Sequence, residues 1–133
     1  MPNKIVLFLV TLVVFLIIDL VWLGFIARHF YRNQLGFLMS ENTNWGAAVV
    51  FYLIYILGLV VFVITPALEK TSWVHAVVYG GLFGLVAYAT YDLTNLATIK
   101  NWPLTVTIVD TIWGTVLTAA TCTASYFISS LIG

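Results

Sequence analysis

The chain has 133 residues, of which 62% are apolar and 8% are charged, whereas soluble domains average about 45–50% apolar and about 25% charged residues. This composition excludes a soluble globular protein, and it excludes a disordered chain because disordered segments lack apolar surface. Five basic side chains balance five acidic ones, with no run of either sign, so we expect no nucleic-acid partner. The composition predicts one integral membrane domain over residues 1–133, with the lipid bilayer as its partner.

Four apolar stretches are long enough to cross a membrane, because a helix needs roughly 20 apolar residues to span about 30 Å of hydrocarbon. They run over about 5–27, 45–67, 73–98 and 103–132. Merging the last two would place the polar turn at 100–103 in lipid, which is the more costly interpretation. Trp45, Trp73 and Trp102 lie at span entrances, as residues of an interfacial belt do. The predicted fold class is all-α, a polytopic membrane four-helix bundle.

Asp19 is the only charged residue within the first span, 5–27. A cleaved signal peptide would need a small-x-small site, which nothing in this segment resembles, so we expect a retained helix. Trp22 lies three residues after Asp19 and therefore on the same helical face. The segment 28–44 is the only sizeable connection that we expect.

Polar side chains also lie inside the second and third spans. Tyr52 and Tyr55 are about two turns from the start of the second span. A stripe with a spacing of four, followed by one residue three positions later, runs along the third span: Gly80, Gly84, Tyr88, Asp92 and Asn95. This stripe passes from glycines, which allow helices to approach closely, to polar groups.

The fourth span carries Asp110, with Trp113 three residues later. Small polar side chains then recur at spacings of three and four: Thr111, Thr115, Thr118, Cys122, Ser125 and Ser129. Such a stripe predicts a helix contact surface, either inside the bundle or between protomers of a homodimer, and the glycines of the third span are a second candidate for a dimer contact.

Two correspondences suggest two repeated helical hairpins. The pattern D-L-x-x-L begins at Asp19 and again at Asp92, and an Asn-Trp pair precedes the second span at Asn44 and the fourth at Asn101. The halves would then be parallel repeats about an axis along the membrane normal. A chance match in a leucine-rich chain is the alternative. The face that bears 28–44 and 99–103 carries three basic residues, and the other face carries two and the terminal amine, so the positive-inside rule gives no orientation.

Three acids lie at one depth. From the helical rise, each is roughly 12 to 15 Å from the basic residues on the face that bears 28–44 and 99–103. An ionisable group at this depth costs several kcal/mol and usually marks a site. We therefore predict an acidic-aromatic pocket open to that face, lined by Asp19, Trp22, Tyr52, Tyr55, Tyr88, Asp92, Asn95, Asp110 and Trp113. Asp92 and Asp110 are the first candidates, because a short turn keeps their helices adjacent.

Three motifs stand out: TYDLTNLAT at 90–98, WP at 102–103 and DTIWG at 110–114. Together with the segment 19–24 and Tyr31, they resemble a bacterial family of small membrane proteins known only as a domain of unknown function. The resemblance covers nearly the whole chain. It implies a four-span, multi-pass protein of the bacterial inner membrane, and it transfers no activity.

Three functions fit this sequence. The acids and aromatic rings predict binding or transport of a cation, a proton or a small cationic or polar solute. One alternative is a membrane enzyme with one aspartate as acid and another as base, or an accessory subunit, linked to lipid or isoprenoid modification. The other alternative is an assembly factor, in which the polar side chains within the membrane serve only to specify helix packing. No nucleophile, phosphate-loop or zinc motif is present, so the catalytic residues of an enzyme stay unknown. Each helix offers only one strong metal ligand, so an Mg²⁺ or Mn²⁺ site would depend on the fold bringing the spans together; we expect no cofactor and no metal site.

Overall fold

The computed structural model of the protein describes residues 2–40 and 42–133, and within these residues every element is helical. In this described part of the chain, four helical segments are long and apolar enough to cross a membrane: Lys4–Ile26, Trp45–Glu69, Trp73–Thr98 and Leu104–Ile132. Their bounds agree with the predicted spans to within two residues. The predicted all-α four-helix membrane bundle is confirmed, whereas the hairpin repeat stays a prediction.

The first two spans are interrupted helices. The first consists of α1 (Lys4–Val21) and the π-helical turn η1 (Trp22–Ile26), and the second of α3 (Trp45–Leu59), the π-helical turn η3 (Val60–Ile64) and α4 (Thr65–Glu69). Between them lie α2 (Arg28–Leu35) and a short 3₁₀ turn, η2 (Gly36–Leu38). The last two spans are the uninterrupted helices α5 (Trp73–Thr98) and α6 (Leu104–Ile132). π-Helical turns are rare and often lie at functional sites.

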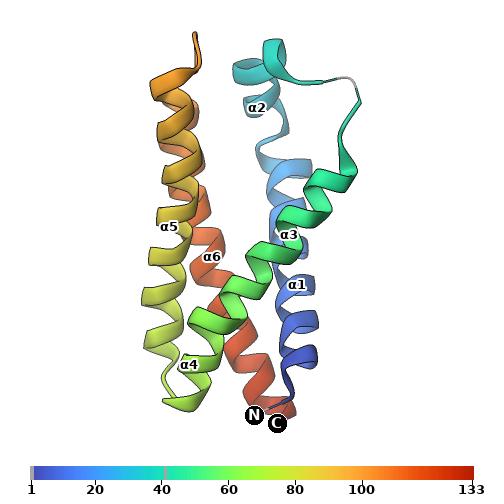
Figure 1. Cartoon of the computed structure of the whole chain (residues 1–133), viewed down its shortest axis with the longest axis vertical. Coiled ribbons are helices and arrows are strands. Elements are labelled where there is room, and N and C mark those ends of the chain that lie inside the picture. Colours follow the sequence, from blue (N-terminus) through green and yellow to red (C-terminus); the bar gives the residue numbers. More distant parts are fainter. Residues whose placement is uncertain (1, 41) are drawn as a thin grey trace.

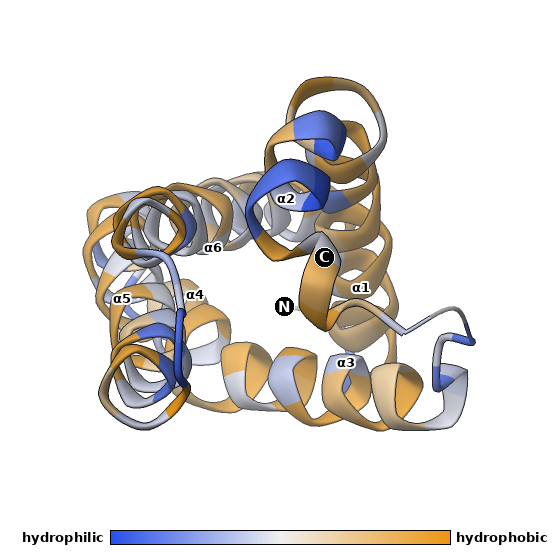
Figure 2. Ribbon diagram, turned by 90° about the horizontal axis from the view of Figure 1, so that it is seen from above, coloured by the Kyte–Doolittle hydropathy of each residue, from blue (hydrophilic) through white to orange (hydrophobic). Residues whose placement is uncertain are grey.

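Figure 1 shows both termini at one end of the bundle, and α2 and the turn between α5 and α6 at the other end. Helix α3 runs obliquely across the bundle, whereas α5 and α6 lie side by side as a hairpin, and α6 also contacts α1. Seen from above, hydrophilic residues gather on α2 and on the α5–α6 turn, and the helices below are mainly apolar (Figure 2). This end of the bundle therefore carries many polar residues, and we call it the polar end.

Very small residues bring α5 and α6 together. A methyl group on Gly84 would overlap the Gly114 carbonyl oxygen, and one on Gly114 would overlap the ring of Tyr88. At Gly80 a methyl carbon would lie 3.0 Å from Cβ of Cys122. The polar stripe of α6 is fully buried inside the chain at Thr118, Cys122, Ser125 and Ser129. Because both small-residue stripes already pack within one molecule, neither is free to form the homodimer contact that we considered.

The fully buried apolar side chains lie mainly in the half of the bundle near the termini. They include Leu7, Phe15, Ile56, Leu59, Ile64 and Leu117. Burying large side chains of this kind is the main source of favourable packing energy. The predicted acids of α1, α5 and α6 lie beyond this core, toward the end that bears α2.

Trp45 and Trp73 are exposed at the starts of their helices, as an interfacial belt requires. Trp102 is not, because the α5–α6 turn directs its indole into the bundle, where it is only 8% exposed. Its Nε1 donates a hydrogen bond to Oγ1 of Thr107 at 3.1 Å. The belt expectation is therefore wrong for Trp102. Asn101 makes the turn possible, since its φ of 65° is a conformation that Asn tolerates well.

Candidate functional site

A cavity of about 220 Å³ lies at the α2 end of the bundle, between α1, η1, α2, α5 and α6. We call it the acid cavity, because Asp19, Asp92 and Asp110 all line it. Aromatic side chains form much of the remaining wall: Trp22, Tyr31, Tyr88, Tyr91, Trp102 and Trp113. None of the described residues that line it is a lysine or an arginine. The structure thus brings together the three acids to which the sequence assigned one depth.

Asp92 is the least exposed of the three acids, with an exposed fraction of 0%. Neither of its carboxyl oxygens has a hydrogen-bond partner among residues 2–40 and 42–133. Its neighbours are the Asp110 carboxyl group and the Thr111 hydroxyl group, and that hydroxyl oxygen is also without a partner there. Leaving a buried polar group unsatisfied costs roughly 1–3 kcal/mol, and more for a charged one. Asp92 is therefore a buried acid with no N–H donor among the described residues.

Two tryptophans form one wall of the acid cavity. The indoles of Trp22 and Trp113 are stacked, with ring centroids 4.3 Å apart and planes inclined by 10°. Nε1 of Trp113 donates a long hydrogen bond to Oδ1 of Asp19 at 3.4 Å, and Asp19 is 8% exposed. Since Trp22 belongs to η1, the π-helical turn at the end of the first span sets the position of its ring in this stack.

Tyr31 fastens α2 to the rim of the acid cavity. Its hydroxyl group donates to Oδ1 of Asp110 at 2.6 Å and accepts from Nε1 of Trp22 at 3.2 Å. Burial, together with the hydrogen bond to Asp110, raises the pKa of the Tyr31 phenol, so this group stays protonated as a donor at neutral pH. The segment 28–44, expected to be a plain connection, therefore supplies part of the site.

The predicted pocket residues divide into two groups. Trp22, Tyr88 and Trp113 line the acid cavity with the three acids. Tyr52, Tyr55 and Asn95 are not brought to its wall: the Tyr55 hydroxyl lies deeper, 2.7 Å from Oγ1 of Thr118, whereas Tyr52 is close to the Asp19 carboxyl group and packs edge-on against Phe15. Asn95 is half-buried on α5, one turn beyond Asp92.

Sequence reasoning missed three aromatic residues of the cavity: Tyr31, Tyr91 and Trp102. Tyr91 is next to Asp92 in the chain, and its ring packs edge-on against Trp102 at 5.9 Å. A signal for Tyr31 was present, because the polar run R-H-F-Y-R-N-Q-L at 28–35 contains no helix breaker and favours a short surface helix. No pattern in the sequence marked Trp102 as buried.

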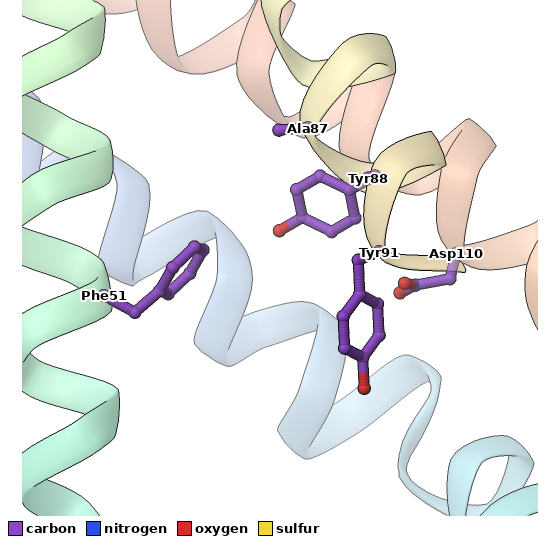
Figure 3. Close-up of a pocket in the computed structure, with 5 residues that line it drawn as sticks. All are labelled: Phe51, Ala87, Tyr88, Tyr91 and Asp110. Carbon is purple, nitrogen blue, oxygen red and sulfur yellow. The ribbon is translucent and has the colours of Figure 1, made fainter. Parts of the chain in front are cut away.

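A second cavity, of about 290 Å³, lies between α3 and α5, and we call it the side cavity. It is lined by Phe51, Ala87, Tyr88, Tyr91 and Asp110. Figure 3 shows Phe51 extending from α3 toward the α5 tyrosines, with the carboxyl group of Asp110 on α6 beside the Tyr91 ring. Three of these five residues also line the acid cavity, so the two cavities adjoin.

The family model described as a predicted membrane protein (DUF2177) matches residues 4–127. The chain belongs to this family. The resemblance that the sequence motifs indicated is thereby confirmed over almost the whole length, and the protein is a small multi-pass membrane protein. No curated protein and no solved structure matches the chain significantly.

In this DUF2177 member the acidic side chains are spread around the acid cavity. In the described part of the chain, no three acidic, histidine or cysteine side chains are grouped closely enough to hold a metal ion. Asp19, Asp92 and Asp110 come from three different spans and face a common space without meeting at one point.

Proposed function

We propose that the acid cavity binds a small organic cation that carries a primary ammonium group. The observation that carries this proposal is Asp92, whose two buried carboxyl oxygens have no donor among the described residues. Asp19 and Asp110 line the same space, and all three acids lie within membrane spans. Like charges crowded at low dielectric need a counter-charge or a proton, and the described lining contains no basic side chain.

The dimensions and chemistry of the acid cavity support this class of ligand. Its volume of about 220 Å³ exceeds that of an engineered cavity of roughly 150 Å³ that binds benzene. A primary ammonium group has three N–H donors, which can bond to the carboxyl oxygens of Asp92 and of its neighbour Asp110. The Trp22 and Tyr88 rings provide π faces, which attract cations. A quaternary ammonium ion lacks the donors and should therefore bind more weakly.

A protein whose polar layer served only for packing would be expected to satisfy its buried polar groups internally. Tyr55 and Thr118 do so, and so do Thr11 and Ser125, with a hydroxyl–hydroxyl distance of 2.7 Å in each pair. Asp92 does not. Thr111, Thr121 and Ser129 on α6 also lack a partner among the described residues, so the support comes from the chemistry of Asp92: an unpaired carboxyl group is costlier to bury than an unpaired hydroxyl group.

The test is calorimetric titration of propylammonium into the protein in lipid nanodiscs. The matched pair of variants is Asp92→Asn, and Glu69→Gln on the exposed end of α4. We expect Asp92→Asn to weaken binding by about tenfold or more, and Glu69→Gln to leave it unchanged. The melting temperature of Asp92→Asn should be equal to or above that of the wild type, because the new amide can donate to Asp110.

Two results would contradict the proposal. One is wild-type protein that binds no primary amine, and the other is an Asp92→Asn variant that keeps wild-type affinity. Tetramethylammonium serves as a second probe, since equal affinity for it would show that N–H donors do not matter. An Asp92→Asn variant that binds normally but melts at a lower temperature would favour the packing-only function.

A further inference from the structure

We infer that the ligand is a single-chain amphiphile, whose ammonium head occupies the acid cavity and whose hydrocarbon chain leaves the protein through the side cavity. This inference rests on the proposed function, because it takes the acid cavity as the site of the head. It adds the chemical class of the rest of the molecule and the route by which that part reaches the bilayer.

The two cavities are continuous in their walls. Tyr88, Tyr91 and Asp110 line both, so a bound molecule that passes these three side chains occupies both spaces. Among the described residues that line the side cavity, Asp110 is the only charged one (Figure 3), and it also lines the acid cavity. The polarity therefore changes along this path from three carboxyl groups to rings and a methyl group.

The remaining wall of the side cavity is suited to hydrocarbon. Phe51 and Ala87 are apolar, and Tyr88 and Tyr91 add ring surface. Its volume of about 290 Å³ is larger than that of the acid cavity. A ligand with a charged head alone would leave this larger, apolar space without a function.

The side cavity opens toward lipid. Phe51 is 48% exposed and Tyr91 is 58% exposed on the outer surface of the bundle. Phe51 lies six residues inside the start of α3 at Trp45, which corresponds to about 9 Å of helical rise. The opening between α3 and α5 therefore faces the hydrocarbon region, where the chain of an amphiphile is already dissolved.

Helix α2 narrows the acid cavity at the end of the bundle that bears it. Tyr31 and Leu35 of α2 line the cavity there, and Tyr31 is hydrogen-bonded to Asp110. The acid cavity is not closed at this end, since the two cavities are about equally open to the outside. The apolar side cavity nevertheless gives an amphiphile in the bilayer a route of its own between α3 and α5.

The experiment compares two probes, dodecylammonium and propylammonium, on three proteins in lipid nanodiscs. In Ala87→Phe the new ring occupies the side cavity, and Ala87 does not line the acid cavity. The control is Ala120→Phe, which adds the same ring on the exposed surface of α6. Partitioning of dodecylammonium into the bilayer is the same for all three proteins, so differences between them report the side cavity alone.

We expect Ala87→Phe to weaken dodecylammonium binding by roughly tenfold and propylammonium binding by less than about twofold. Ala120→Phe should change neither. Phe51→Trp, which enlarges the facing wall, should act as Ala87→Phe does and serves as the second variant if Ala87→Phe does not fold.

The failure of this inference is distinguishable from the failure of the proposed function. If propylammonium binds and both side-cavity variants retain wild-type affinity for dodecylammonium, the inference is overturned and the ammonium site stands. Equal weakening of both probes also overturns it, because the variants would then act on the head site. If neither probe binds to the wild-type protein, the proposed function fails, and this inference fails with it.

Discussion

Gly114 sets the position of Tyr88, which lines both cavities. The Tyr88 ring lies against the α-carbon of Gly114 so closely that a methyl group there would overlap ring carbons. Any other residue at position 114 would therefore push the ring toward the cavities or push α5 away from α6. The position of Tyr88 at the boundary between the two cavities depends on this glycine.

Gly114→Ala should consequently destabilise the protein by about 1–3 kcal/mol, the usual cost of overpacking a close contact. The control is Gly24→Ala, because an added methyl group at Gly24 would meet nothing within 4 Å. Thermal unfolding in detergent measures both changes. A Gly114→Ala variant that melts with the wild type would show that Tyr88 and α6 are not in close contact.

At the residue scale, the three acids were predictable because the helical rise alone fixes their depth. Helical spacing also placed Trp22 and Trp113 on the acid-bearing faces. Helical spacing did not distinguish Tyr55, whose hydroxyl group contacts Thr118 in the core, from Tyr88, which lines the acid cavity. That difference depends on the oblique crossing of α3, which no local pattern encodes.

At the scale of elements, α2 lies over one side of the acid cavity, to which it contributes Tyr31 and Leu35, and we call it the cover. It follows η1 after Ala27, whose φ of −107° and ψ of 3° lie outside the helical region. The hydrogen bonds of Tyr31 to Asp110 and Trp22 connect α2 to the spans. This cover is thus held by a small number of polar contacts.

Tyr31→Phe should release α2 without unfolding the bundle. Losing two hydrogen bonds, one of them to a carboxyl group, should accelerate amide hydrogen exchange within 28–35 by about 10- to 100-fold. Tyr79→Phe is the control, since Tyr79 is exposed on α5 and stacks on His75. Hydrogen exchange with mass spectrometry measures the effect, and unchanged protection of 28–35 would show that Tyr31 does not hold the cover.

The effect of Tyr31 should also depend on pH. Because the pKa of the folded protein's Tyr31 is raised, its contribution is fully present below the ordinary tyrosine pKa of about 10 and is lost as pH rises through the folded value. Protection of 28–35 in the wild type should therefore stay constant through the neutral range.

The apolar runs of the sequence predicted the four membrane spans. They did not predict the cover, because α2 is polar and lies outside those runs.

At the scale of the whole molecule, the four spans were predictable because the thickness of the bilayer fixes their length. The contiguity of the acid cavity with a lipid-facing side cavity was not, because it depends on how α3 leans away from α5 and α6. Both termini and the α4–α5 turn lie at one end, and α2 lies at the other (Figure 1). Because the basic residues are divided almost evenly between the two ends, the positive-inside rule does not determine which end lies on which side of the membrane, and an experiment must decide this.

Single-cysteine labelling tests this arrangement. Cys122 is fully buried and should stay unreactive in the folded protein. The labelling signal should therefore come only from an introduced cysteine. Asn42→Cys, between α2 and α3, and Glu69→Cys, at the end of α4, should react with a membrane-impermeant maleimide from opposite sides of sealed vesicles. Labelling of both positions from one side would rule out the four-span topology.

The glycine-mediated pairing of α5 and α6 also bears on how the protein is made. Asp92 and Asp110 face each other across this hairpin, and the turn that joins the two helices is short. A ribosome-bound chain that releases the two helices into the bilayer together can shield each acid with the other, whereas a lone helix would expose its acid to lipid tails. Biogenesis of the carboxyl-terminal half is therefore best understood as the insertion of a pair.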